Sequence, residues 1–259
     1  MNTADNFADR KTTSEHSCRI YTPDGLSSES SITLVHEHIV EIDVNCIPAV
    51  RLSCTPEHLP ELIAGRLYTE GIIDSIDEVE RLFICGTGET ADITLNKKIE
   101  PASHAETEPT CCTGNKQLLI SADKREMRKF PSKEPDREAV FALAERFRKD
   151  TMLHSITGST HSCYLYAPGG EISEFEDISR HNALDKAVGY ALINGIDITD
   201  CMLYTTGRIP EDMVRKAVMA GVPVLISKAM PTDTAVEMAG AYGLTLICSA
   251  WPDSFKIII

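Results

Sequence analysis

The 259-residue chain lacks the features that mark several large classes of protein. No apolar run approaches the ~18 residues of a membrane-spanning helix, and the N-terminus has no hydrophobic core of a signal peptide. No two of the nine cysteines are spaced CxxC, which argues against a ribbon-type zinc site. No GxGxxG or Walker loop occurs, so an ordinary dinucleotide or NTPase site is not supported. We therefore expect a cytoplasmic protein with reduced thiols.

Basic residues are also scarce. The net charge is −14, with 25 Lys and Arg against 39 Asp and Glu. Non-specific binding to nucleic acid needs clustered cations and is not expected. An anionic ligand would have to be held by a local basic pocket or by helix N-termini. The apolar content of 42% is enough for one or two cored domains.

The first half of the chain alternates apolar and polar residues and predicts a β-rich α+β portion over residues 16–100. Residues 1–15 predict a disordered start. Three or four short strands are expected over 16–54, a helix after Thr55, and a hairpin around residues 86–88.

Residues 101–135 form a polar segment punctuated by proline, and we interpret them as a flexible loop before a domain boundary. The neighbouring Cys111 and Cys112 lie within it, in a Thr- and Gly-rich setting. Buried structural cysteines usually sit among apolar residues, so one reactive thiol is favoured over an inert pair.

Residues 136–259 predict an α/β domain that begins with an amphipathic helix over 137–153. A hairpin and a helix are expected over 157–190, and the helix begins at Arg180, His181 and Asn182. These side chains suit an anion site at a helix N-terminus, although a plain hairpin and core helix explain them equally well.

The remaining chain predicts a βαβαβ unit with parallel strands over 201–206, 222–227 and 244–248. Ligands of open α/β sheets bind beyond the carboxyl ends of the strands. Two of those ends carry a small residue followed by a cation, as Gly207-Arg208 and Ser227-Lys228. The repetition indicates a phosphate-bearing ligand, and the alternative is that both cations only decorate loops.

At this point the residues match a known family. The chain resembles the FdhD formate dehydrogenase accessory sulfurtransferases from about Cys18 to its C-terminus. The matching stretches read RLSCTPEHLPELIAGRLYTEGII, TGSTH, EDISRHNALDKAVG, TTGRIPEDMVRKAVMAGVPVLISKAMPTDTAVEMA and GLTLI.

The resemblance implies a cytoplasmic sulfur carrier, which is a sulfurtransferase. Such a protein takes sulfur from a cysteine desulfurase as a cysteine persulfide. It passes the sulfur to the molybdenum cofactor, in its molybdopterin guanine dinucleotide form, for formate dehydrogenase. The resemblance also implies a three-layer α/β/α domain similar to cytidine deaminases, a homodimer and no permanent metal.

Carried onto this chain, the resemblance places the persulfide on Cys112, with Cys111 as the alternative. The family's cofactor-binding segment corresponds to Ser249, Ala250, Trp251, Pro252, Asp253 and Ser254. The usual arginine of that segment is missing, and Asp253 adds a negative charge. The further residues expected to bind the cofactor are Thr157, Gly158, His161, Arg180, His181, Asn182, Gly207, Arg208, Ser227 and Lys228.

Two rival functions remain. A zinc nucleobase deaminase would need H-x-E and a downstream PCxxC, and the spacing of Pro109-Thr-Cys-Cys is wrong for this. A non-catalytic chaperone would bind the molybdopterin nucleotide without persulfide chemistry, and the missing CxxC and arginine favour it.

Overall fold

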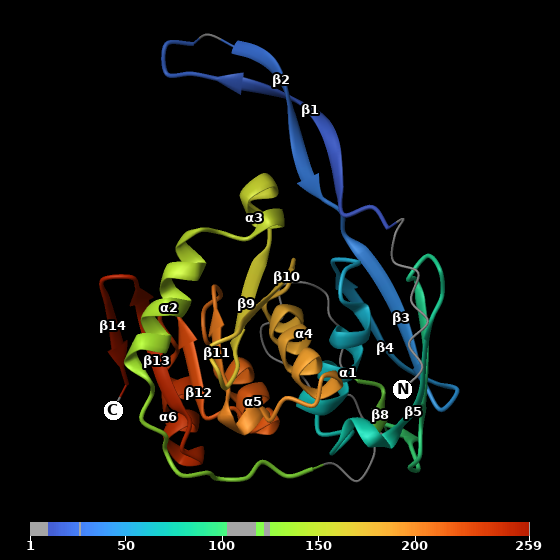
Figure 1. The fold of residues 1–259 in the computed structure, drawn as a ribbon. Helices are drawn as coiled ribbons and strands as arrows, with labels where there is room; N and C mark the ends of the chain where they lie inside the picture. The colour runs from blue at the N-terminus through green and yellow to red at the C-terminus, as the bar shows by residue number, and fades with distance from the viewer. Residues whose placement is uncertain (1–9, 26, 103–117, 122–124, 259) are drawn as a thin grey trace.

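The computed structural model describes residues 10–25, 27–102, 118–121 and 125–258 (Figure 1). Its two larger sheets lie in different halves of the chain. One has four strands in the order β4-β3-β6-β5, and the other has six in the order β10-β9-β11-β12-β13-β14. The fold is therefore mixed α/β, as predicted. No helix in the described ranges is long and apolar enough to cross a membrane.

The four-stranded sheet forms from the alternating sequence of the first half. Its strands are β3 (His38–Val44), β4 (Ile47–Cys54), β5 (Val79–Ile84) and β6 (Thr90–Leu95). Alternate residues of β3 are buried in one core with α1 (Leu59–Thr69). The predicted hairpin of β5 and β6 is confirmed. After η2 (Ile76–Glu78) and this hairpin, the short strands β7 (Glu100–Pro101) and β8 (Ile120–Ser121) pair with each other.

The first two strands stand apart from this sheet. Among the described strands, β1 (Thr13–Tyr21) and β2 (Ser27–Val35) pair only with each other, as an antiparallel ribbon that projects from the body (Figure 1). The prediction of disorder over 1–15 is wrong for residues 13–15. Their backbone polar groups are paired with β2, whereas composition alone indicated a solvated chain. Residues 1–9 lie outside the described part.

The six-stranded sheet contains the predicted βαβαβ unit. β11 (Met202–Thr205), β12 (Val224–Ser227) and β13 (Thr245–Trp251) are parallel, and α5 (Glu211–Ala220) and α6 (Asp233–Tyr242) connect them. On one side β9 (His161–Tyr166) pairs with β11 and with β10 (Ile172–Asp177), both antiparallel. On the other side β14 (Ser254–Ile257) pairs with β13.

Helices cover both faces of this sheet. Tyr164, Tyr204 and Ile226 pack with α2 (Arg137–Arg148), while the alternate residues of the same strands pack with α4 (Arg180–Ile193), α5 and α6. The helix predicted over 137–153 is wrong at its end. α2 ends at Arg148, Asp150 has a φ of 60°, and a separate α3 (Met152–Thr157) follows. The one-turn helix η3 (Ile198–Asp200) precedes β11.

Helices α1 and α4 join the two halves and are in direct backbone contact. A Cβ atom built on Gly65 would lie 1.8 Å from the carbonyl oxygen of Asp185, and one on Gly189 would lie 1.8 Å from that of Glu61. Only glycine permits this approach. The contact fixes α1 on the helix that carries Arg180 and His181. The predicted division into 1–15, 16–100, 101–135 and 136–259 stays a prediction.

Candidate functional site

The carboxyl ends of β11 and β12 meet, as the parallel order requires. Thr205 pairs with Ser227 across the two strands. The buried Ser227 Oγ donates a hydrogen bond of 2.7 Å to the carbonyl oxygen of Gly207, and accepts one from the backbone N–H of Ala229. Ser227 therefore links the ends of β11 and β12 through hydrogen bonds. Arg208 follows Gly207 and Lys228 follows Ser227, so both cations lie at the same edge of the sheet.

Arg180 lies against Gly207. A Cβ atom at Gly207 would approach the Arg180 Cβ and Cδ atoms to 2.9 Å, so the missing side chain makes room for the arginine. The Arg180 Nε is buried and has no hydrogen-bond partner among the described residues. A buried N–H of a guanidinium is costly to leave unpaired, so this geometry indicates a ligand that accepts a hydrogen bond.

His161, at the start of β9, lies in a positive environment. Burial lowers its pKa first, and the nearby Arg180, Lys228 and His154 lower it further. Four basic side chains from different elements therefore converge in a chain whose net charge is −14. The N-caps of α4 and α5, Ser179 and Pro210, provide no capping side chain. The first N–H groups of these helices add to the positive potential at this edge.

An aromatic wall adjoins the cations. The Phe147 ring lies 4.8 Å from Lys228 Nζ, stacks on Tyr204 at 5.5 Å, and meets Trp251 edge-on at 5.6 Å. Trp251 is 44% exposed. A half-exposed indole beside a lysine can stack on a planar base while the cation holds a phosphate.

The segment 249–254 lies in a hairpin, because the strand predicted over 244–248 continues to Trp251 and turns back as β14. Ser249, Ala250 and Trp251 end β13 after a shift in pairing register, Pro252 and Asp253 form the turn, and Ser254 begins β14. Ser249 has a φ of 46°, and the buried Ala250 accepts a hydrogen bond of 2.9 Å from the Tyr204 hydroxyl. The Asp253 carboxylate is exposed at the turn, where solvent screens its charge.

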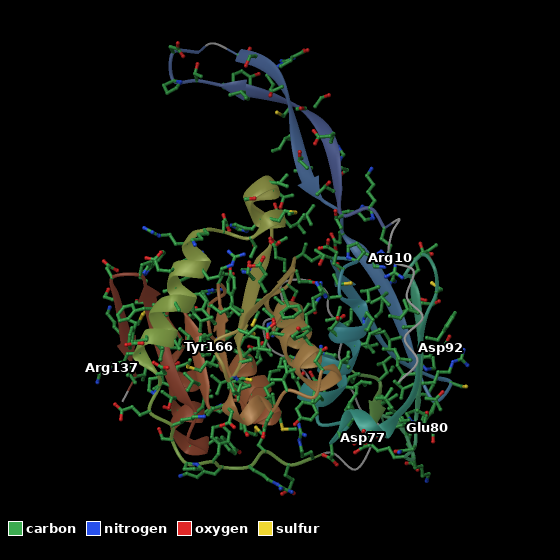
Figure 2. The ribbon with its side chains drawn as sticks, viewed as in Figure 1. Arg10, Asp77, Glu80, Asp92, Arg137 and Tyr166 are labelled. Carbon is green, nitrogen blue, oxygen red and sulfur yellow. The ribbon has the colours of Figure 1, made fainter. Side chains whose placement is uncertain are left out.

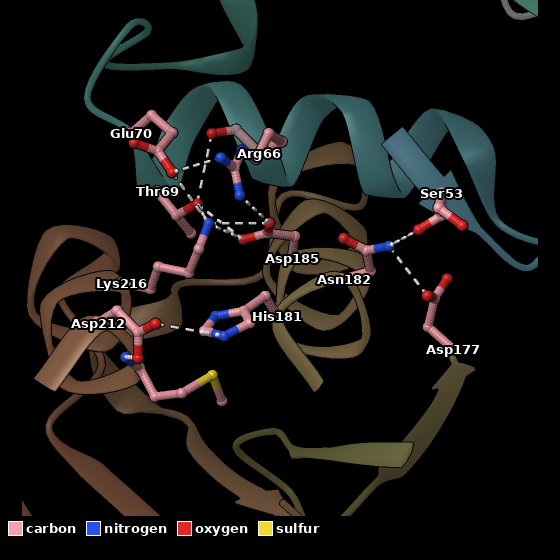
Figure 3. Close-up of polar contacts among 11 residues, drawn as sticks. Ser53, Arg66, Thr69, Glu70, Asp177, His181, Asn182, Asp185, Asp212 and Lys216 are labelled. Carbon is pink, nitrogen blue, oxygen red and sulfur yellow. Dashed lines mark hydrogen bonds and ion pairs between the residues drawn. The ribbon is translucent and has the colours of Figure 1, made fainter. Parts of the chain in front are cut away.

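His181 lies beneath the cations, with a side chain that is only 6% exposed. Its Nε2 is 3.4 Å from Asp212 Oδ2, but the geometry is not that of a hydrogen bond (Figure 3). Burial, and then Lys216 and Arg180, lower the pKa of His181 to about 2. Burial raises the pKa of Asp212, against the opposite effect of Arg180. His181 is therefore a neutral imidazole at physiological pH, and its Nε2 has no hydrogen-bond partner in the described part of the chain.

Asn182 has a structural role and is not placed to bind a ligand. Its side-chain amide donates to the Ser53 carbonyl oxygen at 2.8 Å and to Asp177 Oδ1 at 2.9 Å (Figure 3). Asp177 also pairs with Lys186 Nζ at 2.8 Å, and both side chains are fully buried. These contacts fasten α4 to β4 and β10, so Asn182 does not point at the cation cluster as a free group.

A second buried network lies between α1, α4 and α5. Lys216 Nζ donates to both Asp185 oxygens, at 3.0 and 2.9 Å, and to Thr69 Oγ1 at 2.9 Å (Figure 3). Thr69 Oγ1 donates to Asp185 Oδ1 at 2.7 Å, and an Arg66 nitrogen lies 3.9 Å from Asp185 Oδ2. Each charge in this network has a partner of opposite sign.

Thr157 is the last residue of α3, and Gly158 is the C-cap that leads toward β9. The Thr157 hydroxyl donates to the Leu153 carbonyl oxygen, and Gly158 ends α3 with a φ of 63°. The carboxylate of Glu176 accepts hydrogen bonds from the backbone N–H groups of Leu153 and His154 and so holds the start of α3. Glu176 and the Thr160 carbonyl oxygen therefore hold His154, whose charge acts on His161, and the Thr157 hydroxyl is engaged within its own helix.

Cys111 and Cys112 lie outside the described residues. Of the seven described cysteines, burial raises the pKa of Cys54, Cys163, Cys201 and Cys248 and keeps them as thiols. Cys85 differs: burial raises the pKa of its thiol, but hydrogen bonds from Thr87, Thr90 and Gly88 together outweigh this effect and lower the pKa to about 6. Because a low pKa favours the reactive thiolate, Cys85 must be tested beside Cys111 and Cys112 in any experiment that assigns the reactive thiol. No group of three or more His, Cys, Asp or Glu in the described ranges is arranged to hold a metal ion.

Sequence reasoning missed His154, Phe147 and Asp212 as parts of the site. Phe147 falls inside the amphipathic helix predicted over 137–153, and His154 stands just past the predicted end of that helix. Asp212 lies in the first turn of α5, where an acidic residue is common in any helix. No local signal identifies them, because each contacts the site across elements far apart in the chain.

Comparisons with known proteins give one consistent family. The family model for FdhD/NarQ matches residues 35–258. The Sulfurisphaera tokodaii protein named "Sulfur carrier protein FdhD" is 31% identical over 206 residues, which are 78% of this chain and 79% of the relative. A Bacillus subtilis protein of the same name is 29% identical over 86% of this chain and 87% of its own.

A solved structure agrees in fold. The crystal structure of a Desulfotalea psychrophila protein, a candidate formate dehydrogenase accessory protein by name, superposes with a TM-score of 0.74. It covers 96% of this chain and 97% of its own, at 21% identity. At that identity the likeness concerns the fold alone.

Proposed function

Because this chain belongs to the FdhD/NarQ family, we propose that it is a sulfur carrier for formate dehydrogenase. It accepts persulfide sulfur from a cysteine desulfurase and transfers it to the molybdenum cofactor, in its molybdopterin guanine dinucleotide form. The names of its relatives support this role. The observation that carries the proposal is the convergence of Arg180, His161 and Lys228 on the carboxyl edge of the sheet, with the Arg180 Nε left without a partner among the described residues.

The cofactor is the cargo of this reaction, and its chemistry fits the residues present. Its pyrophosphate supplies the acceptor that Arg180 Nε lacks, with Lys228 and the first N–H groups of α4 and α5 nearby. The guanine base stacks on the exposed part of Trp251. The neutral His181 accepts or donates one hydrogen bond without adding charge. Gly207 keeps the space that Arg180 fills.

The sulfur step is thiol exchange. The Cys112 thiolate attacks the terminal sulfur of the desulfurase persulfide, forms a new S–S bond and releases the donor cysteine as its thiolate. The exchange needs no external oxidant or reductant, and the proton of the donor persulfide remains on the transferred sulfur or passes to solvent. Cys111 is the alternative acceptor. Within this proposal the protein works in the cytoplasm, where its thiols stay reduced.

Intact-mass analysis tests the sulfur step. The protein is incubated with a cysteine desulfurase and cysteine, and the gain of one sulfur atom is measured. We expect the parent chain and Cys85→Ser to gain sulfur, and the double variant Cys111→Ala/Cys112→Ala to gain none. The single variants separate the two loop cysteines. A double variant that still gains one sulfur atom contradicts the assignment, and loss of the gain in Cys85→Ser would move the carrier to the β5–β6 turn.

The rival role as a non-catalytic chaperone makes the opposite prediction. If the protein only binds or delivers the cofactor, serine replacement of Cys111 and Cys112 leaves cellular formate dehydrogenase activity intact. We further propose that the six-stranded unit shares the three-layer arrangement of cytidine deaminases. The packing of α2 on one face and of α4, α5 and α6 on the other supports this proposal.

A further inference from the structure

Asp212 is an acidic residue placed among cations. Other acidic side chains, such as Asp77, Glu80 and Asp92, are exposed on the half of the molecule that contains the four-stranded sheet (Figure 2). Solvent screens charges in such positions. Asp212 differs, because its side chain is only 31% exposed and lies against the buried ring of His181. A carboxylate at this place opposes the binding of an anion by the cation cluster, so its presence needs a physical explanation.

The two carboxylate oxygens of Asp212 have different surroundings. Oδ1 accepts a hydrogen bond of 2.8 Å from the backbone N–H of Met213. Oδ2 lies 3.4 Å from His181 Nε2, in a geometry that is not that of a hydrogen bond (Figure 3). The His181 side chain is only 6% exposed, and no other described residue bonds its Nε2. Two polar atoms therefore face each other across a gap that no hydrogen bond bridges.

An added proton would join these two atoms, and Asp212 is the group that can accept it. Burial, and then Lys216 and Arg180, lower the pKa of His181 to about 2, so the imidazole stays neutral. Burial raises the pKa of Asp212, although Arg180 and then the Met213 N–H act in the opposite direction. As a carboxylic acid, Asp212 could donate from Oδ2 to the neutral Nε2 after a small rotation of either side chain.

The charged groups around this pair come from three helices. They are Arg180 on α4, Lys216 on α5, and Arg66 and Glu70 on α1. Lys216 and Arg66 are engaged by the carboxylates of Asp185 and Glu70. Arg180 differs, because its buried Nε has no hydrogen-bond partner among the described residues. Arg180 is therefore the cation around Asp212 that a bound anion would engage.

An anion at Arg180 would change the protonation of Asp212. In the free protein the arginine charge favours the carboxylate form of Asp212. A pyrophosphate diester brings negative charge and engages that arginine, and both effects favour the protonated acid. The neutral acid in turn no longer repels the ligand. Binding of the anion and binding of the proton should therefore strengthen each other.

We propose that Asp212 and His181 form a proton site beneath the cation cluster, in which Asp212 Oδ2 takes one proton from solvent and donates it to His181 Nε2 when the phosphate-bearing ligand binds. The 3.4 Å approach of these atoms, and the lack of a partner for Nε2 within the described ranges, carry this inference. It rests on the proposed cofactor site and not on the assignment of the persulfide. Asp212 is a positioning residue here, since it acts on the ligand through His181 and Arg180.

Calorimetric titration of the full-length protein with diguanosine pyrophosphate tests the proton site. Both phosphates of this probe are diesters that do not titrate near neutral pH, so any proton exchanged belongs to the protein. The apparent enthalpy, measured in buffers of different ionisation enthalpy, gives the number of protons bound. We expect the parent to take up a net fraction of a proton for each ligand. Its affinity should fall by at most about tenfold per unit as the pH rises from about 5 to about 8.

Asp212→Asn removes the titratable group and keeps the size of the side chain. It should lose most of the proton uptake and bind the probe several-fold more tightly than the parent at about pH 8, where the parent carries the carboxylate. Asp233→Asn is the matched control. Asp233 lies in the first turn of α6 and likewise accepts from the next backbone N–H, but it is exposed. This variant should keep the uptake and the affinity of the parent.

The outcomes separate the proton site from the cofactor site. Binding by the parent without proton uptake overturns the proton site alone. Uptake that persists undiminished in Asp212→Asn also overturns it, and would place the proton on another group such as the half-buried His161. Equal loss of uptake in Asp233→Asn contradicts the assignment to Asp212. Absence of binding by the parent overturns the proton site together with the cofactor site.

Discussion

Two groups of charged side chains lie along helix α4, and they differ in how completely their charges are paired. In the network of Lys216, Asp185 and Thr69, each polar atom has a partner at 2.7–3.0 Å. In the cation cluster, Arg180 Nε is buried without a hydrogen bond among the described residues, and so is Nε2 of the adjoining neutral His181. Paired buried charges fix the packing of elements, whereas unpaired ones indicate where a ligand completes the structure.

The polar residues of α4 differ in role according to their position along the helix. Asp185 and Lys186, in the middle of α4, are fully buried and bind protein groups. Arg180, at the first turn, faces the strand ends beside Gly207. Substitutions in the middle of α4 should therefore change stability, and substitutions at its start should change ligand affinity.

The largest effect is expected from breaking the paired network. Lys216→Met removes the cation that Asp185 and Thr69 contact and leaves the Asp185 carboxylate buried with Arg66 3.9 Å away. Removal of one partner of a buried ion pair costs about 3–5 kcal/mol. Urea unfolding should report a loss of this size in the free energy of unfolding.

The neighbouring residue provides the control for that measurement. Arg215 is 54% exposed and pairs with Glu211 one turn away, and such surface pairs contribute roughly 0–1 kcal/mol. Arg215→Met should therefore unfold almost as the parent does. Equal losses for the two variants would mean that burial of the Lys216 network contributes nothing specific.

A smaller loss of stability is expected where α1 and α4 touch. Gly189→Ala places a methyl group 1.8 Å from the Glu61 carbonyl oxygen, so the two helices must separate. Overpacking of this kind costs about 1–3 kcal/mol. Gly240→Ala is the matched control, because its Cβ in α6 meets nothing within 4 Å and alanine favours a helix by roughly 0.5–1 kcal/mol. Thermal unfolding should shift in opposite directions for the two variants, and a shared direction would refute the close contact.

The βαβαβ unit of β11, β12 and β13 could be predicted because the residues that begin and end its helices can be recognised from the local sequence. Thr232 caps α6 by accepting from the Ala235 N–H, and Gly221 and Gly243 end their helices at a φ of 81°. Hydrophobic runs between these signals gave the strands and their order. The approach of Gly207 and Ser227 followed from that order alone, since parallel strands end at one edge.

The rest depended on contacts that no local pattern encodes. The partner of Lys216 on α1 is 147 residues away in the sequence, and that of Lys186 at Thr55 is 131 residues away. Asn182 looked like a ligand residue because it follows Arg180 and His181, but its amide is engaged by Ser53 and Asp177. The β1–β2 ribbon was only partly predicted, because its serine-rich strands have a weak apolar alternation.

The most direct test of the cation cluster is a calorimetric titration with guanosine diphosphate, with the fluorescence of Trp251 followed in parallel. Trp251 is the single tryptophan, so its signal comes from the proposed site. Loss of a charge-assisted hydrogen bond costs about 1.5–3 kcal/mol. We therefore expect Arg180→Gln to weaken binding by about tenfold or more, with stability unchanged and with Arg215→Gln binding like the parent. Absence of binding by the parent, or equal affinity of Arg180→Gln, would contradict the account.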